Sequence, residues 1–402
     1  MPRLTASLTF LLATQLASGA GYQLAERSAT GLGRAFSGEA AIADDASVIA
    51  SNPAGMSLLD DQSFSFGITG IFADVDVQGS TPFAANISDQ NIIAKGAVPY
   101  AFATKKLTDE LTVGIGAFTT YGLKSDFSSE FASQTGPNFS ELLSFNLNPS
   151  LSYQINDMLS IGAGFNALYA DGELTSNEVG AVLPNTTTIG DDWGYGYNVG
   201  LLFTPNDSFR LGLHFRSAVS LELEGTFDAP ALGQNNQDAT LAVQLPEIVE
   251  LSAYQELNDQ WAVHADVLWT RWSKFDELDV VPSAGFNPPA EREDWENTLR
   301  YAIGATYQHN DRLTIRFGAA YDESPSRTEV RTLRIPDADR VWASAGFSYR
   351  FYEDISLDFG YTHIFADDAD LRSNARGGNT GIFDGEATGR VNIVAIGLSG
   401  SF

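Results

Sequence analysis

The chain has 402 residues and a formal net charge of −28, and it contains no cysteine. The acidic balance argues against nucleic-acid binding, because neutralising phosphates needs clustered Lys and Arg. Without cysteines, an exported chain of this size must hold together without disulfides. Beyond the first 20 residues no apolar run is long enough for a transmembrane helix, although 44% of the residues are hydrophobic. The chain is therefore either soluble after export or crosses a membrane as strands.

The first residues have the three parts of a secretory signal. Arg3 supplies the basic end, the stretch from Leu8 to Leu16 is apolar apart from Thr and Gln, and residues 18–20 are small. A membrane anchor would need about 20 apolar residues, and this run is shorter. We predict a signal peptide over residues 1–20, with the mature chain beginning at Gly21.

The stretch from Gly31 to Gly55 does not alternate like a strand. It is rich in Gly and Ala, carries the acidic pair Asp44 and Asp45, and ends in the tripeptide Asn52–Ala54. Everything after it has the pattern of strands. A compact, turn-rich segment before a long array of strands suggests a plug inserted into a barrel, and we assign this plug to residues 21–62.

From Ser63 onward, apolar residues alternate with small or polar ones, with the period of two that is typical of strands. In Leu313–Asp322 the odd-numbered residues are Leu, Ile, Phe, Ala and Tyr, and the even-numbered ones are small or polar. In a soluble sandwich the apolar face would point inward, whereas in an outer-membrane barrel it faces lipid. Asn-Asp pairs recur at 156, 206, 258 and 310, and both residue types tolerate tight turns. Short turns on one side and longer loops on the other are the outer-membrane pattern.

The chain contains fourteen candidate strands, an even number that suits such a barrel. They span 63–76, 93–106, 111–121, 142–154, 159–173, 193–204, 209–227, 239–255, 261–278, 295–308, 313–323, 339–350, 355–366 and 388–402. We therefore predict an all-β fold, a 14-stranded antiparallel transmembrane β-barrel over residues 63–402, with the N-terminal plug inside its lumen.

Two further features bear on the rim of this barrel. Five tryptophans lie near strand ends, where aromatic girdles belong, although lumenal positions or contacts with the plug fit some of them equally. They are Trp193, Trp261, Trp269, Trp295 and Trp342. Acidic residues gather in expected loops, as in Asp367–Asp370 and Glu291–Asp294. A solvated rim explains these loops, and divalent-cation bridging to lipopolysaccharide is the alternative.

Several separated motifs, in order along nearly the whole mature chain, resemble those of one family. They are Gly31–Ala35 with Ser37 and Gly38, Ala43–Ala46, Asn52–Ala54, Leu245–Glu247, Trp269–Ser273, Asp322–Pro325 and Ile335–Arg340. On these motifs the chain resembles the outer-membrane long-chain fatty acid transporters, the FadL family, which includes channel relatives for aromatic hydrocarbons. The resemblance implies location in the outer membrane of a Gram-negative bacterium.

The resemblance also implies a fourteen-stranded barrel whose N-terminal residues form a hatch below a hydrophobic pocket. The family's hatch motif falls here on Asn52, Pro53 and Ala54. This is physically sensible, because proline fixes one backbone angle and Asn offers both a donor and an acceptor to hold a buried loop. We expect this hatch to gate the barrel.

In the family the third strand is interrupted by an inward kink, through which a hydrophobic ligand can leave laterally into the membrane. The corresponding strand is 111–121, in which Gly114 and Gly116 lie two residues apart. Glycine weakens a ladder and permits a bulge, so we expect the kink and lateral opening there. Close packing against the hatch is the alternative reason for these glycines.

Transport of a long-chain fatty acid needs an apolar pocket for the tail and donors or a cation for the carboxylate. Alternation places Arg210, Arg216, Arg300 and Arg316 in the lumen as candidate head-group contacts, with His214 and His264 on similar faces. The arginines that do not contact ligand are expected to pair with lumenal carboxylates. These are Asp266, Glu250, Asp322 and Asp358.

The sequence favours passive uptake of hydrophobic molecules by a monomer, with outer-membrane lipid and lipopolysaccharide around it and without a cofactor or nucleic acid. A channel for alkanes or monoaromatic hydrocarbons is the alternative within the family, because both branches share these motifs. A general porin, another alternative, would need an open, charged constriction rather than a plugged lumen. An outer-membrane lipase would use His214 or His264, yet no Ser, His and Asp set has convincing spacing, and we predict no enzyme.

Overall fold

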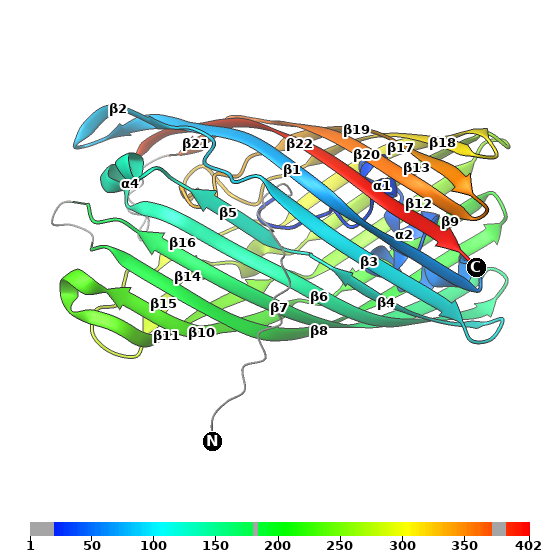
Figure 1. Ribbon diagram of the computed structural model, residues 1–402, viewed down its shortest axis with the longest axis horizontal. Helices are drawn as coiled ribbons and strands as arrows, with labels where there is room; N and C mark the ends of the chain where they lie inside the picture. Colours follow the sequence, from blue (N-terminus) through cyan, green and yellow to red (C-terminus); the bar gives the residue numbers. More distant parts are fainter. Residues whose placement is uncertain (1–19, 180–183, 372–382) are drawn as a thin grey trace, which may run out of the picture.

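The computed structural model describes residues 20–179, 184–371 and 383–402 of the chain. Almost all of the predicted signal peptide therefore lies outside the described residues. The chain forms a closed barrel of fourteen antiparallel strands, as predicted (Figure 1). The circle closes where β1 (Gln62–Thr81) pairs with β22 (Asp384–Ser401) along 18 residue pairs, so the wall has no free edge there. No helix of the described part is long and apolar enough to cross a membrane.

Between β1 and β22 the wall contains twelve further strands, some of them built from two segments. In order they are β3 (Gly96–Lys106), β4 (Leu111–Phe118) with β5 (Gly122–Asp126), β6 (Pro137–Asn156), β7 (Leu159–Ser176), β8 (Thr186–Asn206), β9 (Phe209–Arg216) with β10 (Val219–Ala229), β11 (Gln234–Leu245) with β12 (Ile248–Glu256), β13 (Trp261–Thr270), β17 (Thr298–Asn310), β18 (Leu313–Asp322), β19 (Arg340–Tyr352) and β20 (Ile355–Ala366).

Short strands and one helix decorate the ends with longer loops. They are β2 (Ala84–Asp89), α4 (Ser129–Thr135), β14 (Glu277–Leu278), β15 (Val280–Pro282), β16 (Glu291–Arg292) and β21 (Ala369–Leu371), with the 3₁₀ turns η2 (Pro230–Leu232) and η3 (Trp272–Lys274). The predicted strand 261–278 is longer than the observed one, because β13 ends at Thr270 and the chain then turns through η3. The candidates 209–227 and 239–255 are each broken once, between β9 and β10 and between β11 and β12.

The Asn-Asp pairs form the tight turns that their spacing predicted. At four of them the Asn side chain accepts a hydrogen bond from the backbone N–H two residues later, at 2.9 to 3.1 Å. This local bond imitates a backbone turn and fixes where each strand reverses. The acceptors are Asn156, Asn206, Asn258 and Asn310. The regular turns therefore lie at one end of the barrel and the longer connections at the other (Figure 1).

Alternation separates a lipid-facing wall from a lumen. Ile303 and Phe317 are 66% and 49% exposed on the outside, whereas Arg300 and Arg316 on the same two strands are buried inside. The tryptophans divide in the same way. Trp193 and Trp261 are exposed on the outer surface, but Trp295 and Trp342 are buried inside the molecule, so these two belong to the lumenal alternative rather than to a girdle.

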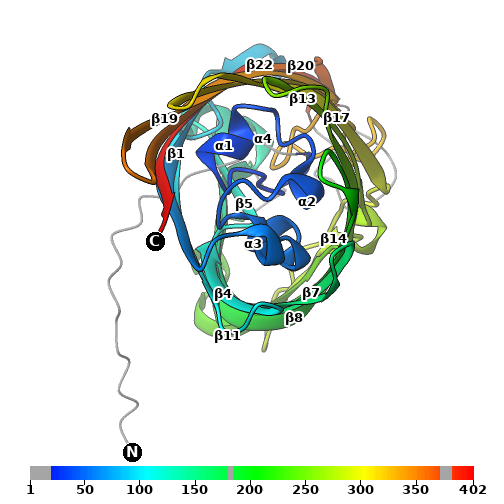
Figure 2. The same cartoon turned by 90° about the vertical axis from the view of Figure 1, so that its right-hand side faces the viewer.

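Residues 20–61, here called the N-terminal segment, lie within the ring of strands (Figure 2). The segment contains three one-turn helices and a 3₁₀ helix. These are α1 (Ala29–Leu32), α2 (Glu39–Ile42), α3 (Val48–Ser51) and η1 (Pro53–Leu58). α1 contacts β19 and β20, α2 contacts β9 and β12, and η1 contacts β6, β7 and β8. The segment is thus attached to most of the circumference.

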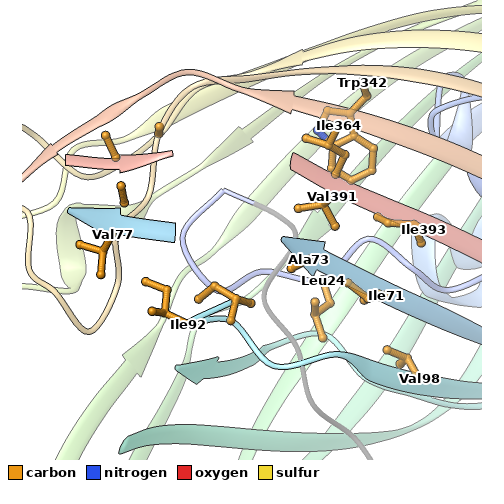
Figure 3. Close-up of a cluster of buried hydrophobic side chains, with 14 of the residues drawn as sticks. Leu24, Ile71, Ala73, Val77, Ile92, Val98, Trp342, Ile364, Val391 and Ile393 are labelled. Carbon is orange, nitrogen blue, oxygen red and sulfur yellow. The ribbon is translucent and has the colours of Figure 1, made fainter. Parts of the chain in front are cut away.

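Apolar packing also joins the segment to the wall. Leu24 is 1% exposed and belongs to the same buried cluster as Ile71 and Ala73 of β1 and Ile393 of β22. Figure 3 shows Leu24 beside the β1 side chains and below those of β22. Each large buried aliphatic group of this kind contributes about 1.5–3 kcal/mol.

Lumenal glycines let the backbone of the segment touch the wall. A Cβ atom on Gly212 would lie 1.8 Å from the carbonyl oxygen of Ala40, and one on Gly318 would lie 2.0 Å from that of Arg34. The backbone of the segment is therefore seated directly on β9 and β18 at these two positions, without intervening side chains.

We expect Gly212→Val to loosen the N-terminal segment, because the added side chain collides with the Ala40 carbonyl. Overpacking of this kind costs about 1–3 kcal/mol. Limited proteolysis should then cleave within residues 20–61 while the barrel stays intact on a gel. Ala319→Val, on the lipid-facing surface of β18, is the matched control. Equal protease resistance of both variants would contradict the packing argument.

Candidate functional site

The Asn52–Ala54 tripeptide is hydrogen-bonded to two wall strands, β8 and β6. Asn52 is fully buried and its Nδ2 donates to the Ala40 carbonyl at 2.7 Å and to the Leu201 carbonyl of β8 at 3.0 Å. Its Oδ1 accepts from the Ala54 N–H at 3.0 Å, and Pro53 begins η1. The Ala54 carbonyl in turn accepts from Ser152 Oγ of β6 at 3.0 Å. The Asn side chain thus uses its donor and its acceptor at once.

The four candidate head-group arginines all donate to the N-terminal segment. Arg210 reaches the Ile42 carbonyl at 2.7 Å, Arg216 the Ala50 carbonyl at 2.7 Å, and Arg300 the Ala35 carbonyl at 2.6 Å. The fourth, Arg316, donates to Asp44 Oδ2 at 3.0 Å and to Ser348 Oγ at 2.7 Å. Short helices leave free carbonyls at their ends, and guanidiniums from the wall satisfy them here. Contact of these arginines with a ligand head group stays a prediction.

The expected pairing of these arginines with lumenal carboxylates was wrong. Among the residues described, none of the four forms an ion pair with Asp266, Glu250, Asp322 or Asp358. Asp322 instead accepts from the Ala20 N–H at 3.2 Å, and Asp358 accepts from Ser348. The physical reason is the segment itself, which offers backbone acceptors that a strand pattern cannot reveal.

An ion network links the segment to β18. Arg34 pairs with Glu39 at 2.6 Å and with Asp44 at 3.0 Å, and the same Asp44 oxygen pairs with Arg316 at 3.0 Å. Burial alone would raise the pKa of Asp44, but the Arg34 and Arg316 guanidiniums hold the pKa of that carboxyl below its ordinary value. Asp44 is thus the charge that joins the plug to the wall. The sequence showed Asp44 only as half of an acidic pair.

The two histidines of the lipase alternative face different neighbours. His264 Nδ1 lies 2.7 Å from Ser37 Oγ, and its Nε2 lies 3.2 Å from Thr306 Oγ1. Ser37 also donates to the Arg34 carbonyl at 2.7 Å and is fully buried. His214 Nδ1 lies 3.7 Å from Glu250. The Ser37 and His264 pair has Thr306 in place of the carboxylate that orients a catalytic histidine, so its geometry is that of a structural contact.

The third wall strand is interrupted, but not at the predicted glycines. Gly114 and Gly116 lie in a continuous ladder with both β3 and β6. A Cβ on Gly114 would lie 2.7 Å from Met56 Sδ of η1, which supports the packing alternative for that residue. The ladder with β3 stops at Ala117, and β5 then pairs with β6 and contacts residues 92–94 instead of β3.

The interruption falls at residues 119–121, where the N-terminal segment replaces the missing partner. The Leu24 N–H donates to the Thr120 carbonyl at 2.8 Å, and the Gly122 N–H donates to the Tyr22 carbonyl at 2.9 Å. No local sequence pattern marks this position, because the wall strand pairs here with residues about 100 positions away in the chain.

The interruption leaves a window in the ladder. Residues 96–100 of β3 pair with β1 but not with β5. The ladder of β3 and β4 bounds the window on one side, and backbone contacts between residues 92–94 and 124–126 bound it on the other. Val98 beside the window belongs to the same buried apolar cluster as Leu24. Side chains rather than hydrogen bonds therefore fill this part of the wall.

An aromatic group surrounds the first residues of the segment. The Tyr22 ring lies 4.9 Å from Trp272, 5.3 Å from Phe275, 5.6 Å from Trp295 and 6.0 Å from Tyr121, between ring centroids. These rings belong to an apolar cluster that continues through β10 and β11. The sequence signals for this group were the motif Trp269–Ser273 and Trp295, one of the tryptophans for which contact with the plug was an alternative.

Some carboxylates of the acidic loops bond to other parts of the chain. Glu291 pairs with Arg334 at 2.9 Å, and Glu293 accepts from Trp295 Nε1 at 2.9 Å and from Thr332 Oγ1 at 3.1 Å. Burial raises the pKa of the Glu293 carboxyl well above its ordinary value. Within the described ranges no group of three or more His, Asp or Glu side chains is arranged to hold a metal ion.

We expect Asp44→Asn to weaken docking of the segment by about 1–3 kcal/mol, because two guanidiniums lose their shared anion. A carboxyl with a lowered folded pKa stabilises the fold above its unfolded pKa, about 3.9, and this stability is lost as the pH falls through the folded pKa. The wild type should therefore lose protease resistance of the segment below about pH 4.

The segment of Asp44→Asn should already be cleaved more readily at pH 7. Its protease resistance should then change less than that of the wild type as the pH falls. Asp61→Asn, at the exposed last residue of the segment, is the control. Identical pH profiles for Asp44→Asn and the wild type would exclude the ion network as the source of the pH dependence.

Comparison with known proteins identifies the family to which this chain belongs. Residues 10–402 match the family model described as "Outer membrane protein transport protein (OMPP1/FadL/TodX)". The long-chain fatty acid transport protein of Salmonella typhi is 34% identical over 388 residues, covering 88% of this chain and 89% of the relative. The 47 kDa outer membrane protein of Pasteurella multocida is 35% identical over 380 residues, covering 87% and 88%.

Solved structures share the fold. A FadL homologue of Pseudomonas aeruginosa superposes with a TM-score of 0.84 at 21% identity, covering 95% of this chain and all of the other. The Pseudomonas putida toluene transporter TodX superposes with a TM-score of 0.71 at 16% identity, covering 96% and 99%. From the family match and the identities above 30%, this chain is an outer-membrane β-barrel that belongs to the OMPP1/FadL/TodX family of transport proteins.

Proposed function

We propose that this protein carries hydrophobic molecules passively across the outer membrane, with long-chain fatty acids as the preferred substrates. The window beside residues 119–121 carries the proposal, because it is a place where the wall is closed by apolar side chains and by the N-terminal segment. The curated relatives with this activity in their names, at 33–34% identity, support the substrate class.

The route begins among the outer loops and enters the apolar interior around Trp272 and Trp295. Burying a methylene there contributes about 0.8 kcal/mol, so a long acyl chain gains affinity without any chemistry. The filled lumen disfavours the general porin, since the segment contacts the wall strands on several sides. Transport therefore needs a rearrangement rather than an open pore.

Residues 20–27 are the part of the hatch that we expect to move. They contain no helix, and they pair with the wall at the interruption. Displacing Tyr22 and Leu24 breaks two backbone hydrogen bonds and uncovers the window in the same motion. A ligand lying in the apolar interior then leaves sideways into the membrane instead of crossing the rest of the lumen.

A disulfide tests this motion directly. Gln23 and Tyr121 are paired in an isolated antiparallel bridge, a geometry whose Cα separation of about 4.5–5.5 Å suits a disulfide. The chain has no native cysteine, so Gln23→Cys with Tyr121→Cys gives one defined crosslink. We expect oxidised cells to lose most oleate uptake and reduced cells to regain it, with each single cysteine variant as a control. Equal uptake in both redox states would rule out movement of residues 20–27.

The hatch motif is tested by Asn52→Ala and Pro53→Ala, with oleate uptake measured in a strain that lacks its own transporter. We expect a severalfold fall in uptake, because Asn52 makes three hydrogen bonds that position η1. Asn206→Ala, in an exposed turn, is the control. Unchanged uptake would remove the tripeptide from the mechanism.

The hydrocarbon alternative is tested by deletion of this one protein. We expect slower growth on oleate and unchanged growth on alkanes or toluene. The reverse result would move the chain to the hydrocarbon branch, whose structures share its fold. We also propose that the protein acts as a monomer surrounded by lipid and lipopolysaccharide, because the closed barrel contains its own plug.

A further inference from the structure

The connection between β18 and β19, residues 323–339 and here called the strap, turns inward at the outer mouth of the barrel. More than half of its residues are buried. Leu333 belongs to the same buried apolar cluster as Leu24, and Ile335 belongs to the cluster around Tyr22. A connection on the solvated rim would leave most of its side chains exposed. The strap therefore lies within the mouth rather than around it.

The side chain of Arg334 joins the strap to the opposite wall. β6 is the fourth strand of the wall and β18 the eleventh of fourteen, so the two lie on opposite sides of the ring. Arg334 donates to Ser140 Oγ of β6 and to Ser176 Oγ of β7, each at 2.8 Å. It also donates to the carbonyls of Phe139 and Thr175, each at 3.1 Å. The strap thus spans the whole mouth.

The same guanidinium also pairs with a carboxylate. Arg334 Nε donates to Glu291 Oε1 at 2.9 Å and to Oε2 at 3.1 Å, and Glu291 belongs to β16 in the connection between β13 and β17. The Arg334 side chain is 4% exposed. All three of its nitrogens are bonded, which uses the planar fork that Arg has and Lys lacks. We call this set of contacts the latch.

The far end of the strap contacts the first residues of the N-terminal segment. Asp337 accepts from the Gly21 N–H at 3.1 Å and from Ser324 Oγ at 2.6 Å, and it forms an ion pair with Arg340. Asp337 lies three residues after Arg334, in a stretch without helix or strand. One short piece of chain therefore connects the latch to the residue that precedes Tyr22.

We propose that the strap is an outer gate and that Arg334 is the positioning residue that holds it closed. The proposal rests on the proposed transport function, because it adds an entry step to the route through the lumen. In the latched state Ile335 occupies the same apolar cluster as Trp272 and Trp295, so an incoming hydrophobic molecule has to displace the strap. Release of Arg334 frees the strap from β6 and β7, and Asp337 carries the movement to Gly21.

The first test measures entry past the strap and needs no transport. Leu123 is 7% exposed and lines a small cavity together with Ile335. Leu123→Cys gives the chain its one thiol, and a charged maleimide too large for general porins is added to intact cells. In this background we expect Arg334→Met to raise the labelling rate about tenfold or more, because charge-assisted hydrogen bonds are lost. Arg327→Met, at an exposed arginine of the same strap, is the matched control.

The second test closes the strap covalently. The double variant Arg334→Cys with Ser176→Cys lacks the latch, and a short bismaleimide joins its two thiols. We expect oleate uptake to be lost after this joining and to persist after N-ethylmaleimide, which caps the thiols separately. Equal uptake after both treatments would overturn the gate.

The two readouts separate the possible failures. Equal labelling rates in Arg334→Met and Arg327→Met would overturn the proposal and leave Arg334 a structural role. Absence of oleate uptake in the wild type would overturn the proposed function instead, and the labelling rates would still decide whether Arg334 closes the mouth.

Discussion

The structure depends on one constraint, that every backbone N–H and C=O group in the hydrocarbon layer needs a partner inside the protein. The wall meets this constraint by closing on itself through β1 and β22. At residues 119–121 the strand leaves its neighbour β3, and the freed groups of Thr120 and Gly122 pair with Leu24 and Tyr22. The one irregular point of the third strand is therefore also the point where the plug is part of the wall.

The same constraint explains the polar lumen. Three one-turn helices expose backbone carbonyls that cannot be satisfied within such short elements. Wall arginines supply the donors, and lumenal glycines let the backbone come close enough to receive them. Asn52 donates to the carbonyls of Ala40 and Leu201, and its Oδ1 caps η1 by accepting from the Ala54 N–H. The plug is held at its middle by these side-chain bonds and at its beginning by strand-like backbone pairing with residues 120–122.

The proposed motion divides the segment into two parts. Residues 28–58 contain the helices and the ion network of Asp44, whereas residues 20–27 contain no helix and pair with the wall at the interruption. In that proposal, gating belongs to these eight residues next to the window.

The sequence by itself determined the barrel, the number of its strands and the location of its turns. A period of two and Asn-Asp turn pairs are local properties, and a closed antiparallel wall follows from them. The sequence also determined the family, through motifs such as Asn52–Ala54. It placed the four arginines in the lumen but assigned them the wrong structural partners.

Only the tertiary structure decided where the third wall strand is interrupted and which groups the lumenal arginines bind. The interruption at residues 119–121 arises from pairing with residues 22–24, and no local pattern encodes a contact over that distance. The partners of the lumenal arginines also depend on where the segment sits within the barrel, because backbone carbonyls of the segment and Asp44 accept from them.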